Sequence, residues 1–144
     1  MKKTILTILA VLAAIIIITG IIVYISVQKY HDENTFADIE VTTKSRSLDP
    51  YQENYTKQNF SDTCIKGSVM ELEPKDYTVT VMKVTHDGMV DVKINSRGGL
   101  WVDKVEYGKD DIITLHQGET KVFNEMVMDA EFIIEVKVAS VYYR

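Results

Sequence analysis

The sequence predicts a single N-terminal transmembrane helix followed by an all-β extracytoplasmic domain, a small antiparallel immunoglobulin-like β-sandwich of about seven strands. Two observations predict this organisation. Of the 24 residues from Thr4 to Val27, 19 are apolar, and none of the 25 residues between Lys3 and Lys29 is charged. From Cys64 onward, β-branched and aromatic residues alternate with polar ones, which is the period of strands with one buried face.

The apolar run over residues 4–27 is long enough to cross a bilayer core, for which about 20 apolar residues suffice. Its isoleucines are poor helix formers in water, but in lipid a single segment must satisfy its own backbone hydrogen bonds and becomes helical. The alternative is a cleavable signal peptide, whose apolar region spans roughly 7–15 residues before a small-x-small triplet. This run is longer and lacks such a triplet just after it, which favours an uncleaved signal anchor; cleavage in a fraction of molecules stays open.

Lysines flank the run unevenly. Lys2 and Lys3 precede it, whereas Lys29 on the other side is followed closely by two carboxylates. The positive-inside rule therefore predicts a cell-membrane protein with residues 1–3 in the cytoplasm and the C-terminal domain outside. The first predicted partner is the lipid bilayer, contacted through residues 4–27.

The outer portion is acidic. It holds all 21 Asp and Glu residues but 14 of the 16 Lys and Arg residues, and the lysines are scattered singly. A nucleic acid partner needs clustered cations, so none is predicted. Cys64 is the one cysteine of the chain, which leaves no intramolecular disulfide. A disulfide-free domain of this size is more typical of the bacterial cell envelope than of a secreted eukaryotic protein.

Polar residues dominate residues 28–63, and this range is predicted to be a stalk or linker that holds the domain clear of the lipid. Within it, Asp49 followed by Pro50 and Gln52 has the form of a helix N-cap, a proline at the first helical position and a capping-box acceptor. A short helix over 50–59 is therefore expected.

Residues 64–144 are expected to form the β-sandwich, with Asp87-Gly88 as a hairpin turn because glycine accepts positive φ. The predicted strands are 65–72, 76–85, 89–96, 100–107, 111–116, 120–127 and 131–143. The predicted core consists of Val69, Tyr77, Val79, Val81, Val90, Val92, Ile94, Trp101, Val105, Ile113, Leu115, Val122, Ile134, Val136 and Val138.

The sequence offers little for catalysis. His31, His86 and His116 lie far apart in the chain, and the motifs of hydrolases, nucleotide-binding loops and zinc sites do not occur. The acidic pair Asp110-Asp111 comes nearest to a cation site, but carboxylates also simply favour turns. No metal, cofactor or catalytic residue is therefore predicted, and the chain is not expected to be an enzyme.

The remaining expectation is a non-catalytic interaction module with a protein partner, such as an accessory subunit of an envelope assembly. The candidate interaction surface comprises Tyr107, Asp110, Asp111, Tyr142 and Tyr143; the last two lie on opposite faces of the final strand, so that one can pack while the other is exposed. Two alternatives stay open. One is a secreted or surface domain that binds a glycan or Ca²⁺, and the other is an enzyme that uses Cys64.

Overall fold

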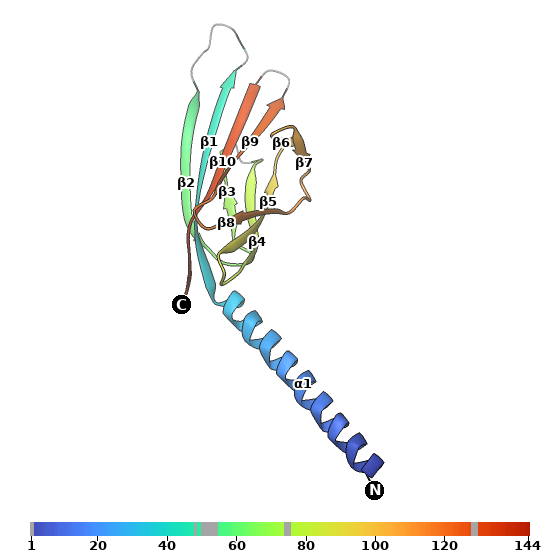
Figure 1. The fold of residues 1–144 in the computed structure, drawn as a ribbon. Helices are drawn as coiled ribbons and strands as arrows, with labels where there is room; N and C mark the ends of the chain where they lie inside the picture. Colours follow the sequence, from blue (N-terminus) through green and yellow to red (C-terminus); the bar gives the residue numbers. More distant parts are fainter. Residues whose placement is uncertain (1, 48, 50–54, 74–75, 128–129) are drawn as a thin grey trace.

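Figure 1 shows a computed structural model of the chain, in which a long helix leads into a β-domain. The structure describes residues 2–47, 49, 55–73, 76–127 and 130–144. Within these residues one α-helix, α1 (Lys2–Glu33), precedes ten strands that form two antiparallel sheets. This confirms the predicted order of one long apolar N-terminal helix followed by an all-β part, although the ten strands exceed the seven expected.

Helix α1 is apolar on all sides. The side chains from Thr4 to Val27 are exposed, and the helix extends away from the β-domain (Figure 1). The hydroxyls of Thr19 and Ser26 are satisfied within the helix, since they donate to the carbonyl oxygens of Ile15 and Ile22, both at 2.8 Å. The helix is therefore long and apolar enough to cross a membrane.

The larger sheet contains six strands, and the first and last strands of the domain pair in its interior. Their register runs from Thr35↔Tyr143 to Ser47↔Ala130, with a β-bulge at Asp38 and Ile39. The sheet order is β2 (Thr56–Cys64), β1 (Thr35–Ser47), β10 (Ala130–Tyr143), β9 (Thr120–Val127), β6 (Leu100–Val102) and β7 (Val105–Tyr107). Because β1 follows α1 directly, this sheet joins the helix to the domain.

The smaller sheet contains four strands, in the order β3 (Val69–Glu71), β4 (Thr78–Val84), β5 (Met89–Asn95) and β8 (Ile113–His116). The hairpin predicted at Asp87-Gly88 is present between β4 and β5. Gly88 adopts a φ of +92°, and the amide of Thr85 donates to the carbonyl oxygen of Met89 at 2.9 Å.

The expectation of a polar stalk over residues 28–63 is wrong. Helix α1 continues to Glu33, and β1 and β2 occupy most of the remainder. In β1 the residues that face the core are Thr35, Ala37, Ile39, Val41 and Thr43, so small and polar residues hide the strand period in the sequence. The expected helix over 50–59 is also wrong where it can be judged, since 56–59 belong to β2; residues 50–54 lie outside the described residues.

The predicted strand over 100–107 is instead a hairpin. Its two arms, β6 and β7, are joined by Asp103 and Lys104, whose φ values are +48° and +74°. Two successive residues in the left-handed region form the tight turn that matches the twist of adjacent strands. Neither residue is a glycine, so the usual sequence signal for this turn is missing.

The core lies between the two sheets and draws on both. It comprises Ala37, Ile39, Val41, Cys64, Met70, Leu72, Tyr77, Val79, Val81, Val84, Val90, Val92, Ile94, Leu100, Ile113, Leu115, Phe123, Phe132, Ile134, Val136 and Val138. Four predicted core residues are wrong, because Val69, Trp101, Val105 and Val122 are exposed. In β6 and β9 the neighbours Leu100 and Phe123 face inward instead, and a shift of one residue reverses the face of a strand.

Candidate functional site

The connection between α1 and the sheet is a single residue, Asn34. Its amide and its side-chain amide both donate to the carbonyl oxygen of Tyr30, at 3.2 and 2.8 Å, and the hydroxyl of Thr35 donates to the carbonyl oxygen of His31 at 2.6 Å. These bonds satisfy carbonyl groups that the end of a helix otherwise leaves unpaired. The chain thus passes from helix to strand without a flexible spacer.

A second contact fixes the helix end to the smaller sheet. The carboxylate of Asp32 accepts hydrogen bonds from the amide of His86 and contacts its Nδ1, both at 3.0 Å, while the Nζ of Lys83 lies 4.0 Å away. The ring of His31 lies 5.9 Å from that of His86 and 5.0 Å from that of Tyr143. We call these five residues the junction cluster. It gathers side chains from α1, β4, the β4–β5 hairpin and the end of β10.

Sequence reasoning missed this cluster. It treated His31 and His86 as distant residues of a stalk and a hairpin, whereas the fold brings their rings together. No local signal could have found the pair, because its contact depends on where β4 packs relative to the helix. Among the described residues, no group of three or more His, Cys, Asp or Glu side chains is arranged to hold a metal ion.

The structure separates the five residues of the predicted interaction surface into two groups. Tyr142 and Tyr143 lie at the helix-proximal end of β10, and their side chains do diverge as expected. Tyr142 stacks on Phe36, with the ring centroids 6.0 Å apart, while Tyr143 is 48% exposed beside His31. The final pair is thus one packed and one exposed aromatic.

Tyr107 lies in β7, an edge strand of the larger sheet that is three strands away from β10, and Asp110 and Asp111 follow β7 in the chain. The Tyr107 ring packs edge-on against Phe123 with a centroid distance of 6.1 Å. The carboxylate of Asp111 accepts the amide of Gly108 at 2.7 Å, so this acidic residue holds its own turn. The predicted surface is therefore not one continuous surface.

Asp38 forms a polar cluster on the outer face of the larger sheet. Its carboxylate accepts hydrogen bonds from the hydroxyls of Ser140, Thr63 and Tyr142 at 2.6, 2.7 and 3.2 Å. The Ser140 and Thr63 hydroxyls, together with that of Tyr142, hold the pKa of Asp38 below its ordinary value of 3.8. The cluster ties β1 to both of its neighbouring strands close to the helix.

Cys64 is a poor candidate for a nucleophile. Its side chain is fully buried, and burial in apolar surroundings raises the pKa of the thiol from 9.0 to about 11. The thiol therefore carries little thiolate at neutral pH, and its burial keeps substrates away. In the fold it is a core residue at the end of β2.

Apolar side chains of three strands form a surface that we call the outer patch: Trp101 of β6, Val122 and Met126 of β9, and Ile133 of β10, arranged around Asn124. Trp101 and Ile133 both pair with Asn124 across the strands, and Val122 and Met126 lie two residues to either side of it. Side chains two residues apart in a strand share a face, and diagonal neighbours lie within about 7–8 Å. The four apolar side chains thus surround Asn124 on the outer face of the larger sheet.

The side chains of the outer patch are exposed to solvent, unlike those of the core. Trp101, Val122 and Met126 are 44%, 41% and 73% exposed, and Ile133 is half-buried. The side of the patch toward β1 carries the ion pairs Lys44–Glu135 and Arg46–Glu131, at 2.5 and 2.9 Å. An aromatic residue and a methionine next to charged side chains form a composition that protein interfaces favour.

Comparison with protein-family models, with curated proteins and with solved structures finds no match for this chain.

Proposed function

We propose that the chain is a single-pass membrane protein whose β-domain lies outside the cell membrane and acts as a non-catalytic module that binds a protein partner through the outer patch. The observation that carries the proposal is the exposure of Trp101, Val122 and Met126 around Asn124 on one face of the larger sheet. A soluble domain of this size has no packing reason to leave a tryptophan and a methionine together in water. The immunoglobulin-like character of the domain stays a prediction.

The membrane part of the proposal rests on α1. A helix that is apolar all around is stable when lipid surrounds it, and the exposed side chains of residues 4–27 meet this requirement. Lys2 and Lys3 before the span favour a cytoplasmic N-terminus. A bacterial envelope protein with an acidic outer domain fits this arrangement.

The position of the outer patch suits a partner that lies above the membrane. Val122 and Met126 pair with Glu135 and Glu131, which are 8 and 12 residues before Tyr143 at the helix-proximal end of β10. At about 3.4 Å per strand residue, the patch lies about 27–41 Å along the sheet from the junction. The short connection through Asn34 holds this distance without a flexible stalk.

A charge-insertion experiment tests the proposed surface. The variant Val122→Lys/Met126→Lys, expressed as the full chain, should lose its partner in crosslinking pull-downs from native membranes, because two ammonium groups cannot be desolvated at an apolar interface. The matched control is Val69→Lys/Ile112→Lys, which places the same charges at two exposed apolar positions outside the patch. Equal partner recovery with the two variants would contradict the proposal.

Topology is tested separately. Protease added to intact cells should remove a C-terminal tag while a tag before Lys2 stays protected. A C-terminal tag that survives until the cells are lysed would place the β-domain in the cytoplasm and contradict the extracytoplasmic part of the proposal.

A further inference from the structure

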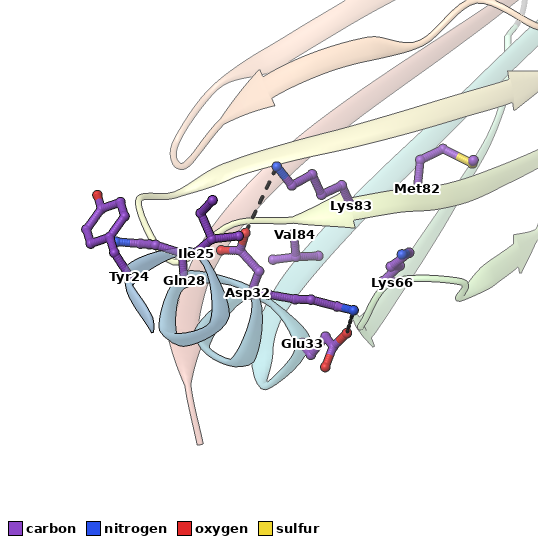
Figure 2. A pocket seen from close by; sticks show the side chains of 10 residues that line it. Tyr24, Ile25, Gln28, Asp32, Glu33, Lys66, Met82, Lys83 and Val84 are labelled. Atoms are coloured by element: carbon purple, nitrogen blue, oxygen red, sulfur yellow. Dashed lines mark ion pairs between the residues drawn. The ribbon is translucent and has the colours of Figure 1, made fainter. Parts of the chain in front are cut away.

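A pocket of about 480 Å³ lies between the end of α1 and β4 (Figure 2). One wall is formed by the last turns of the helix, from Tyr24 to Glu33, and the opposite wall by Met82 and Val84 of β4 together with Lys66 from the turn after β2. The pocket does not overlap the outer patch. It is open on one side and lies where the helix leaves the apolar run.

The pocket is apolar at the end nearer the membrane-spanning run and cationic at the end nearer the β-domain. Tyr24 and Ile25, on the side toward the apolar run, are 65% and 59% exposed, whereas Lys29 lies one turn further along. Lys66 and Lys83 add two further ammonium groups from the β-domain. An apolar side next to a cationic side is the pattern that an amphiphile with an anionic head would match.

The lysines of the pocket outnumber its acidic residues by one. Asp32 is already engaged by the amide and ring of His86, both at 3.0 Å, and Lys83 lies at 4.0 Å from it. Glu33 lies 3.8 Å from Lys29 in an exposed pair, a kind that contributes little. Lys66 makes no ion pair within the described part of the chain. Three cations therefore face two carboxylates, each of which lies near one lysine, and Lys66 supplies the excess positive charge.

The pocket lies at the height of the lipid headgroups when α1 spans the membrane. If the bilayer core ends near Val27, the six residues to Glu33 rise about 9 Å along the helix. The headgroup region on each side of a bilayer is about 5–8 Å thick. Lys29 and Asp32 would therefore lie within the headgroup region and Glu33 at its outer edge, with Tyr24 and Ile25 at the boundary of the acyl chains.

We infer that this pocket binds the headgroup of an anionic phospholipid of the surrounding leaflet, with the phosphate among Lys29, Lys66 and Lys83 and the upper acyl chains against Tyr24 and Ile25. The inference rests on the membrane anchoring in the proposed function but not on the outer patch. It gives the acidic β-domain a local attachment to a lipid surface that its net charge would otherwise repel. One bound lipid would also support the helix end in its position against β4.

Native mass spectrometry of the full chain tests the inference. Protein in detergent is titrated with phosphatidylglycerol or with phosphatidylcholine of the same chain length, and the fraction that retains one lipid is measured. Retention of phosphatidylglycerol should exceed that of phosphatidylcholine. Because each lysine near a lipid surface contributes roughly fivefold in affinity, Lys66→Gln should weaken retention about fivefold. The triple change Lys29→Gln/Lys66→Gln/Lys83→Gln should weaken it by about a hundredfold.

The matched control is Lys57→Gln/Lys93→Gln/Lys109→Gln, which removes the same charge from positions outside the pocket. This control should retain the lipid as the unmodified protein does. Equal retention of both lipids, or equal losses in the two triple variants, would overturn the inference. So would displacement of the lipid by millimolar inorganic phosphate, which would indicate a site for free phosphate.

A separate measurement distinguishes failure of the lipid-binding inference from failure of the proposed membrane anchoring. Extraction of cell membranes with carbonate shows whether each variant remains an integral membrane protein. A chain that resists extraction but shows no lipid preference overturns the pocket alone. A chain that is extracted overturns the anchoring and, with it, the pocket.

Discussion

At the scale of single residues, the hydrogen bonds that hold the β-domain together involve carboxylates whose importance the sequence does not reveal. Asp38 and Glu125 each lie in a strand that reads as ordinary alternating sequence. Asp38 accepts three hydroxyl hydrogen bonds, and Glu125, only 1% exposed, accepts the amide of Gly98. Each of these partners is distant along the chain, so residue type and spacing could not predict the contacts.

Asp38 makes stability depend on pH in a defined direction. Its pKa in the folded protein lies below its ordinary value of 3.8, because the hydroxyls of Ser140, Thr63 and Tyr142 favour the charged form. Its contribution is therefore present above about pH 4 and is lost as the pH falls through the lower, folded value. We expect Asp38→Asn to reduce the free energy of unfolding by about 1 kcal/mol at pH 6. Chemical denaturation of the full chain in detergent should show the difference shrink as the pH is lowered below about 4, and a difference that stays constant there would contradict this assignment.

Glu125 provides a second prediction at this scale. In Glu125→Ala the amide of Gly98 loses its carboxylate acceptor, and we expect the free energy of unfolding to fall by about 2 kcal/mol, as for other hydrogen bonds to a charged group. Glu125→Gln keeps a carbonyl oxygen that can accept the same amide and should cost clearly less. A Cβ added at Gly98 would lie 3.0 Å from Oε1 of Glu125, so Gly98→Ala should also destabilise. Equal losses for the Ala and Gln variants in denaturant titrations would show that this hydrogen bond does not matter.

At the scale of elements, the sequence predicted the strands in which apolar and polar residues alternate clearly. It missed the strands in which small or polar residues face the core and obscure this alternation. The alternating runs of β4, β5 and the last part of β10 lie where expected, and their apolar residues, such as Val79, Val92 and Val136, are buried. β1 escaped prediction because threonine, alanine and lysine blur its period, and its long pairing with β10 spans most of the domain sequence. Pairing between distant strands is a property of the whole fold.

The outer patch depends on which residues of β9 face the core and which face outward. Val122 and Phe123 are both apolar, and the sequence does not say which of them faces inward. In the structure Phe123 is fully buried and Val122 is 41% exposed, since the larger ring fills the space between the sheets. The wrong expectation for Trp101 has the same origin, with Leu100 as the buried neighbour.

Mutation of the two neighbours tests this register. Phe123→Ala should reduce the free energy of unfolding by about 3–5 kcal/mol, as for other large buried aromatic residues. Val122→Ala, on the outer face, should change it by less than about 0.5 kcal/mol. Thermal and denaturant unfolding of the full chain measure both. A larger loss for Val122→Ala than for Phe123→Ala would show that Val122, not Phe123, faces the core. The outer patch would then not exist.

At the scale of the whole molecule, the main correction to the sequence interpretation is the absence of a stalk between α1 and β1 in the described residues. A disordered 35-residue linker would let the domain move over roughly 30–35 Å. Instead Asn34 alone separates the helix from β1, and Asp32 contacts the β4–β5 hairpin. The domain is thus held in one orientation relative to the helix, and the outer patch at a fixed distance from its end.

The contact between Asp32 and His86 can be measured at the same scale. Asp32→Ala should speed hydrogen exchange of the His86 amide about fivefold, because the amide loses its carboxylate acceptor, worth about 1 kcal/mol at a partly exposed site. The control is Glu33→Ala, which removes the adjacent carboxylate but touches Lys29 on the same helix. Exchange mass spectrometry of a peptide over residues 84–89 should detect the first change and leave the second unaltered. Equal exchange in both variants would show that the helix end is not held to the hairpin.

The central claim, that an anchored outer domain binds a protein through its outer patch, is tested most directly by photocrosslinking in intact cells. A photoreactive amino acid replaces Met126 in the patch or, as the control, Val69 on the other sheet; both positions are exposed, by 73% and 55%. The account predicts a discrete protein adduct from position 126 that position 69 does not give. The same adduct from both positions, or none from position 126, would contradict it.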